Sequence, residues 1–114
     1  MSKTYHISVS HPWFGFIQMG VKTVEGRKNK GLFADLKIGD VVYWTNGNDS
    51  VKTKIINKKI YKSFYEMIED NGIKNVLPGY TNIKEGVEKV YYKFYTPEDE
   101  KKYGVVGIEI KKID

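Results

Sequence analysis

Hydrophobic and polar residues alternate along several short segments of the chain, as they do in strands that bury one face. Tyr5, Ile7 and Val9 form one such series, and a longer series ends in Ile60 and Tyr61. The sequence predicts strands over four segments: 5–9, 41–44, 51–61 and 104–113. The Asn46-Gly47 pair separates the second from the third and predicts a hairpin with a type I′ turn, in which Gly47 has a positive φ.

Helix signals fill the intervals between these strands. Ser10-His11-Pro12 begins a short aromatic helix that ends at Gly20, because proline is tolerated in the first turn and glycine ends helices. Ser63 and Glu66 form a capping box ahead of a second helix. Residues 82–95 carry hydrophobic side chains at intervals of three and four and predict one amphipathic helix. Thr96 and Pro97 begin a last, acid-capped turn.

The size and composition of the chain indicate a single domain over residues 1–114, and the predicted order of strands and helices makes it α+β. With 114 residues, 40% of them hydrophobic, the chain can bury one core. It contains no cysteine, which excludes disulfides, thiolate metal sites and cysteine nucleophiles. No segment approaches the ~20 apolar residues of a membrane span, and the N-terminus lacks an apolar signal core. We therefore expect an intracellular, cytoplasmic protein without a membrane partner.

Charged side chains with no evident structural purpose gather between Gly20 and Arg27, directly after the aromatic helix. If this segment is extended, Thr23, Glu25 and Arg27 share one face, and Lys22 at the entry can turn toward them. An acid beside two bases and a hydroxyl is typical of a polar site. The alternative is an ordinary surface ion pair on an edge strand.

The same stretch resembles the ASCH domain of the PUA-like superfamily. The resemblance depends on a Gly-x-Lys-x-x-Glu-x-Arg pattern, here Gly20 to Arg27, followed by Gly39-Asp40 ahead of an apolar strand. It implies a small, mixed, mostly antiparallel β-barrel of about five strands with helices packed around it. It also implies a module that binds RNA or a nucleotide-like ligand, such as a modified nucleoside.

The resemblance assigns the ligand to a cleft that contains four residues: Trp13, Lys22, Glu25 and Arg27. In that cleft Lys22 and Arg27 would bind a phosphate or a carbonyl, and Glu25 would accept a hydrogen bond from an exocyclic amine. Trp13 would form an apolar wall, whereas the sequence without the resemblance favours an ordinary core position for it. We expect no cofactor.

Two further functions remain open. One branch similar to this family hydrolyses acetylated cytidine with a lysine and a threonine nucleophile; Lys22 matches that lysine, but Glu25 stands at the threonine position and Thr23 is only adjacent. A hydrolase here, or a ribonuclease that needs no metal, would use Lys22 and Glu25 as catalytic residues, with Thr23 as a weak candidate. The third interpretation is a protein-interaction module in which the Glu25–Arg27 pair only braces the fold.

Composition adds a modest argument for nucleic acid. The net charge is +5, and 14% of the residues are aromatic, which suits phosphate neutralisation and base stacking. Lys28 and Lys30 follow Arg27 in a polar loop and are candidates for a phosphate-contacting rim. His6 and His11 are the only histidines, and neither has an acidic residue at a ligand-like interval, so we expect no metal site. His6 is expected to point into a polar layer.

Overall fold

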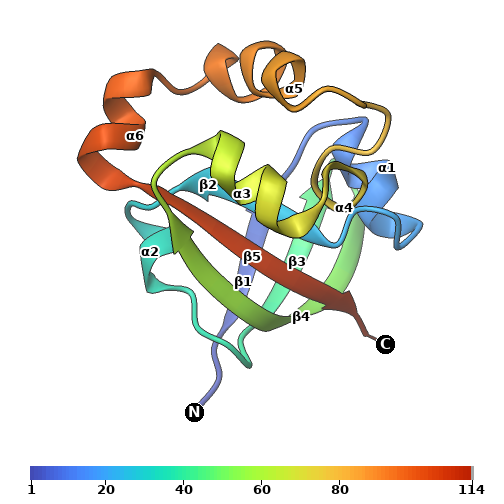
Figure 1. The fold of residues 1–114 in the computed structure, drawn as a ribbon. Coiled ribbons are helices and arrows are strands. Elements are labelled where there is room, and N and C mark those ends of the chain that lie inside the picture. The colour runs from blue at the N-terminus through green and yellow to red at the C-terminus, as the bar shows by residue number, and fades with distance from the viewer. Residues whose placement is uncertain (114) are drawn as a thin grey trace.

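A computed structural model describes residues 1–113 and contains one five-stranded sheet (Figure 1). The strands lie in the order β1-β3-β4-β5-β2. The β1–β3 pair is parallel, and the other three pairs are antiparallel. The strand bounds are Thr4–Ser8 (β1), Val24–Lys28 (β2), Val41–Asn46 (β3), Asp49–Tyr61 (β4) and Val105–Lys112 (β5). This is the mixed, mostly antiparallel α+β architecture that the family resemblance implies, curled into a half-barrel.

Helices connect the strands at the predicted places. Their bounds are Trp13–Gln18 (α1), Leu32–Asp35 (α2), Phe64–Asn71 (α3), Ile73–Val76 (α4), Ile83–Lys89 (α5), the 3-10 turn Tyr91–Lys93 (η1) and Pro97–Tyr103 (α6). Both predicted helix starts carry an N-cap. The Ser63 side chain accepts from the backbone N–H of Glu66, which is one half of the predicted capping box, and Thr96 and Asp99 make a reciprocal capping box. Within residues 1–113 these helices are too short and too polar to cross a membrane.

Two local predictions need correction. The hairpin joins β3 to β4 as expected, but its two central residues are Gly47 and Asn48, because Asn46 pairs with Asp49. Gly47 has φ 60°, and no non-glycine residue among those described has a positive φ. The turn is therefore of the II′ kind, which needs a positive φ only at its first central residue.

The helix predicted over 82–95 is broken at Val90, which has φ −106° and ψ −64°. A β-branched residue followed by aromatic ones propagates a helix poorly. Tertiary packing then decides the path: Tyr91 and Tyr95 both stack on Phe64, with ring centroids 4.2 and 5.3 Å apart. The tyrosines of this segment consequently belong to a turn.

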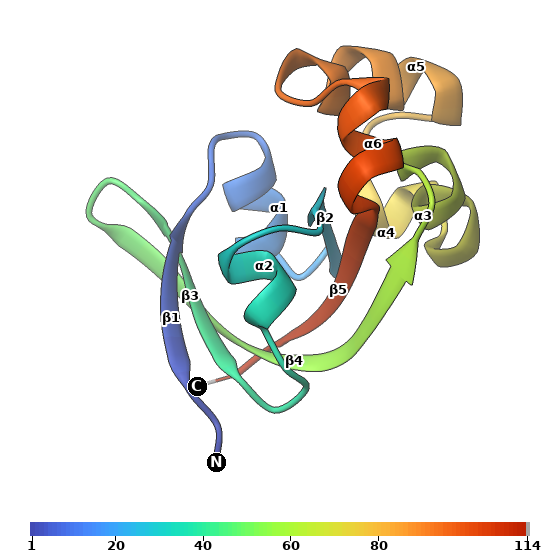
Figure 2. The same cartoon turned by 90° about the vertical axis from the view of Figure 1, so that its left-hand side faces the viewer.

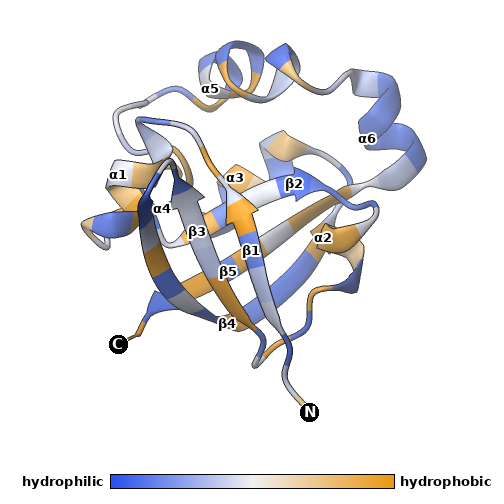
Figure 3. Cartoon of the chain, turned by 180° about the vertical axis from the view of Figure 1, so that it is seen from behind, coloured by the Kyte–Doolittle hydropathy of each residue, from blue (hydrophilic) through white to orange (hydrophobic). Residues whose placement is uncertain are grey.

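The hydrophobic residues form two cores, one on each side of the curled sheet. Burial alternates along β1, where Tyr5 and Ile7 are less exposed than the residues beside them, as in a strand with one buried face. Figure 3 shows a hydrophobic band near the C-terminal end of this strand. Inside the half-barrel, Trp44, Ile55 and Ile108 pack with Phe14 and Ile17 of α1. The second core lies between the outer side of β2 and β5 and the segment from α3 to η1, and Trp13 packs against both.

The half-barrel is open between its two edge strands. β1 and β2 are the ends of the strand order, and within the described chain each pairs with one neighbour only. In Figure 2, α1 and α2 lie between these two strands. The polar stretch at Glu25 and Arg27 therefore sits on an edge strand, facing an opening that the sheet does not close.

Candidate functional site

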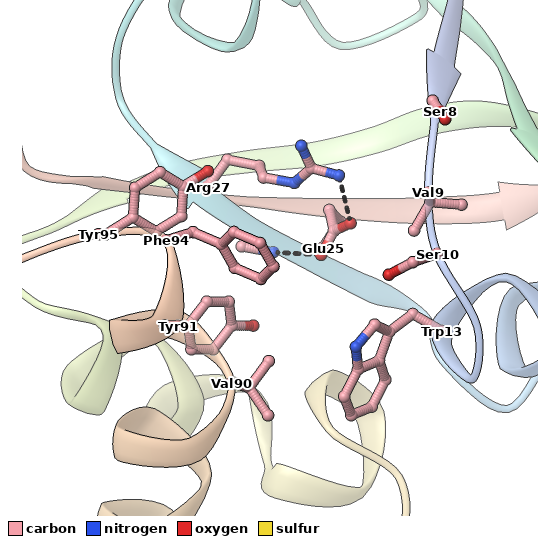
Figure 4. Close-up of a pocket in the computed structure, with 11 residues that line it drawn as sticks. Ser8, Val9, Ser10, Trp13, Glu25, Arg27, Val90, Tyr91, Phe94 and Tyr95 are labelled. Carbon is pink, nitrogen blue, oxygen red and sulfur yellow. Dashed lines mark hydrogen bonds and ion pairs between the residues drawn. The ribbon is translucent and has the colours of Figure 1, made fainter.

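A cleft of about 240 Å³ lies at this opening (Figure 4). Its residues come from three parts of the chain: the end of β1 and the start of α1, the middle of β2, and the turn that contains η1. They are Ser8, Val9, Ser10, Trp13, Glu25, Gly26, Arg27, Val90, Tyr91, Phe94 and Tyr95. The two edge strands thus supply one polar floor, and the segment after α5 closes the cleft from the helical side.

Glu25 and Arg27 lie side by side on this floor, two residues apart on β2. A guanidinium nitrogen of Arg27 donates to Oε2 of Glu25 at 3.2 Å, and Oε1 accepts from the backbone N–H of Gly26 at 3.1 Å. Glu25 is 5% exposed. Burial alone would raise the pKa of Glu25, but the charges of Lys22 and Arg27 outweigh it and lower this pKa. Glu25 is therefore an ionised, acceptor-only group at neutral pH.

Arg27 keeps one side toward the cleft while its guanidinium rests on Phe33 of α2, 4.6 Å from the ring centroid. Its side chain is 24% exposed, in contrast to that of Glu25. Aromatic stacking and the ion pair fix the plane of the guanidinium. Among residues 1–113, one of its five N–H groups donates to Glu25, which leaves four for other acceptors. The predicted face that joins Glu25 and Arg27 is present.

Lys22 supports this pair from inside the protein. Its ammonium donates to the carbonyl oxygens of Val24, at 2.8 Å, and of Val76, and it lies 3.5 Å from Oε1 of Glu25. These three partners use all three of its N–H donors. Burial lowers the pKa of Lys22, and Glu25 opposes that shift. Lys22 is near Glu25, as predicted, but it holds the carboxylate in place and does not line the cleft.

Thr23 differs from the prediction in the same way. β2 begins only at Val24, so the alternation expected from residue 22 onward does not apply to Thr23. Its backbone N–H donates to Asn75, and its carbonyl accepts from Ile110. Thr23 and Lys22 border a separate hollow beside β5. The two residues that a hydrolase would most need are thus both outside the cleft that holds Glu25 and Arg27.

Three other candidates also lie outside the cleft. His6 is exposed and stacks on Tyr43 at 4.9 Å, so it does not enter a polar layer. Lys28 pairs with Asp99 at 3.8 Å, and Lys30 lies 4.8 Å from the ring centroid of Tyr103, so both belong to the side of the molecule near α6. Their service as a phosphate rim stays a prediction.

The aromatic walls of the cleft are the part that sequence reasoning largely missed. Trp13 is at the predicted wall, stacked on Tyr80 at 6.3 Å and with the Lys22 ammonium 5.6 Å from its ring. The opposite wall is formed by Tyr91, Phe94 and Tyr95, which the 82–95 periodicity assigns to packing. Phe94 is 77% exposed, and this is unusual for a packing residue. The density of aromatic residues over 91–95 was the one available signal.

A second, more open groove of about 430 Å³ adjoins the cleft and shares Trp13, Val90 and Phe94 with it. Tyr80 and Pro78 lie along this groove, together with Lys89 and Lys93. The cleft is therefore continuous with a surface that combines aromatic rings with cations.

Comparison with known proteins agrees with the fold and with the family resemblance. The family model described as "ASCH domain" matches residues 7–114. The chain is similar to the crystal structure of hypothetical protein PH0355, with 42% identity, a TM-score of 0.88, and coverage of 96% of this chain and 99% of that one. It is also similar to the solution structure of protein PF0455 from Pyrococcus furiosus, with 37% identity, a TM-score of 0.80, and coverage of 97% and 98%.

No curated protein matches the chain. The family match covers almost the whole sequence, and it includes the edge strand β2, the end of β1 and every residue of the cleft. This protein is a member of the ASCH domain family.

Proposed function

We propose that the cleft binds one nucleobase of an RNA or of a nucleotide-like ligand, with the base between aromatic walls and its polar edge on Glu25 and Arg27. The observation that carries this proposal is the buried, ionised Glu25 held next to Arg27 on the floor of a cleft flanked by aromatic side chains. An acceptor beside a planar set of donors matches the mixed donor and acceptor edge of a base.

The dimensions of the cleft favour a single base. Pockets for drug-sized ligands typically measure about 300–1,000 Å³, and this cleft has about 240 Å³. A flat group can enter between Trp13 and Phe94, whose rings offer the faces on which bases stack. Phe94 in particular is mostly exposed to solvent.

The adjoining groove supports RNA as the natural source of that base. Tyr80 and Phe94 supply stacking surfaces next to the cleft. Lys89 and Lys93 place cations where the sugar-phosphate backbone of an RNA would leave the cleft. RNA binding is also the activity that the ASCH resemblance implies. Hydrolysis is less well supported, because Lys22 and Thr23 border a different hollow.

Parallel titrations test the proposal. Short single-stranded RNA oligonucleotides and a panel of free nucleosides are added to the protein, and binding is followed by calorimetry. We expect both to bind, and we expect Arg27→Gln to weaken both by about 10-fold or more, as for a charged hydrogen bond of about 1.5–3 kcal/mol.

Lys54→Gln is the matched control, because it removes the same charge from an exposed position on β4 that is remote from the cleft lining. Circular dichroism verifies that both variants fold. Equal losses of affinity in the two variants would mean that the overall positive charge, and not the cleft, accounts for binding. Binding of neither RNA nor nucleosides by the wild type would overturn the function.

A further inference from the structure

Tyr91 carries the one buried side-chain nitrogen or oxygen atom among residues 1–113 that has no hydrogen-bond partner. The residue is 5% exposed, and its ring is fixed by stacking on Phe64 at an interplanar angle of 11°. Its hydroxyl points into the cleft, toward the space between Glu25 and Trp13 (Figure 4). Burial raises the pKa of Tyr91 well above its ordinary value, so the hydroxyl keeps its proton.

An unpaired buried hydroxyl costs free energy that a phenylalanine would not. Two other tyrosines show the ordinary solution: the hydroxyl of Tyr92 donates to Glu100, and that of Tyr61 donates to Asp70, each at 2.5 Å. Tyr91 instead keeps its ring in the second core and its hydroxyl at the wall of the cleft. A partner that enters the cleft would account for this hydroxyl.

Together with the floor, Tyr91 completes a set of three polar groups. Glu25 only accepts, Arg27 only donates, and a protonated tyrosine hydroxyl can donate. Glu25 lies between the other two in the cleft (Figure 4). The complementary edge therefore has an N–H flanked by two acceptors, and it is uncharged, because an anion at this depth would meet the Glu25 carboxylate.

We propose that Tyr91 contacts the ligand and that the deep end of the cleft selects a base with an imide edge, as in uracil. This inference rests on the function proposed above. The phosphate of the ligand stays outside the cleft. Uracil presents carbonyl, N–H and carbonyl in that order. Cytosine presents an amine and two acceptors, so one of its groups would face a like partner. Tyr91 and Arg27 would each donate to one carbonyl, and Glu25 would accept from the ring N–H.

Tyr91→Phe separates this role from a structural one. We expect unchanged or higher stability toward urea, because the variant only removes an unpaired hydroxyl. We expect uridine and a uridine tetranucleotide to bind about three- to tenfold more weakly, the range of one neutral hydrogen bond, while cytidine binding, weaker in the wild type, changes little. Inorganic phosphate should not displace uridine.

Tyr92→Phe is the matched control. Its hydroxyl bonds Glu100 and is not part of the cleft lining, so this variant should lose stability and keep its affinity for uridine. The inference is overturned if Tyr91→Phe loses as much stability as Tyr92→Phe, if it binds uridine like the wild type, or if phosphate competes. Arg27-dependent binding that Tyr91→Phe leaves intact would overturn this inference alone; absence of any binding by the wild type would overturn the proposed function as well.

Discussion

Two buried polar networks in this small protein differ in whether every polar group in them has a hydrogen-bond partner. Inside the half-barrel, the hydroxyl of Thr53 accepts from the indole N–H of Trp44 at 2.8 Å and donates to the carbonyl of Val42 at 2.9 Å. In the cleft at the opening between β1 and β2, Glu25 and Arg27 pair with each other, and the Tyr91 hydroxyl beside them has no partner within the described chain.

The difference distinguishes polar groups that stabilise the fold from polar groups that serve binding. A satisfied network such as that of Thr53 specifies packing and needs nothing from outside. An incomplete one is expensive, and proteins retain such groups mainly where they serve binding or catalysis. The same contrast exists within the cleft: Lys22 is saturated with protein partners, whereas Arg27 keeps free donors. The changes below test where the boundary between the two kinds of network lies.

The largest effect is expected from Glu25→Ala, because it leaves the Lys22 ammonium buried without its carboxylate. Breaking a buried ion pair from one side costs about 3–5 kcal/mol of unfolding free energy. Urea denaturation measures this loss. The double variant Lys22→Met with Glu25→Ala should be more stable than Glu25→Ala alone, because it removes the stranded charge. A loss below about 1 kcal/mol in the single variant would contradict the buried pair and imply that water reaches Lys22.

A smaller loss is expected from Thr53→Val in the closed network. The substitution leaves the Trp44 indole N–H without an acceptor at a fully buried site, at a cost of about 1–3 kcal/mol. Affinity for RNA and nucleosides should stay at the wild-type value. Thr81→Val, at an exposed position, serves as the control and should change neither quantity. Weakened ligand binding in Thr53→Val would show that the two networks are coupled.

The pH dependence of stability should also distinguish the networks. The pKa of Glu25 is lower in the folded protein than its unfolded value of about 4.3. The unfolded state therefore binds more protons in this range, so the stability from Glu25 is complete above that value and is lost as pH falls through the folded pKa. Glu25→Gln should reduce the acid-induced loss, and Thr53→Val should leave it unchanged. Urea unfolding from neutral pH to pH about 3 measures both; an unaltered pH profile in Glu25→Gln would refute the ionised carboxylate.

The sequence predicts the frame of the site well, because the frame depends on local signals. Period-two alternation locates the strands, and Ser63 and Thr96 locate helix starts through caps that need only neighbouring residues. The pair Glu25 and Arg27 follows from the same alternation on β2. Each of these inferences uses residues a few positions apart in the chain.

What the sequence could not provide depends on contacts between distant segments. Lys22 is held by the carbonyl of Val76, more than fifty residues away, and nothing near Lys22 indicates that it turns inward. The break at Val90 brings Tyr91 and Phe94 to the cleft, although their spacing is that of a packed helix face. A period alone cannot tell a buried hydroxyl with a partner from one without.

The smallest expected effect concerns the cations around the cleft, which decide how much of the binding is electrostatic. A ligand whose base is held in the deep end and whose backbone meets one or two lysines should lose RNA affinity with a log-log salt slope of about −0.7 to −1.4, at ~0.7 per phosphate. Free nucleosides should show almost no slope.

Lys93→Gln, in the adjoining groove, should flatten the RNA slope by about 0.7. Lys28→Gln and Lys30→Gln should flatten it less, because Asp99 already pairs with Lys28 and both lysines lie on the side near α6. Calorimetric titration at several salt concentrations gives each slope. A slope near −3 that Lys28→Gln and Lys30→Gln together flatten by about 1.4, with base preference unchanged in Glu25→Gln, would assign RNA binding to a general basic surface and leave the polar groups of the cleft without a ligand.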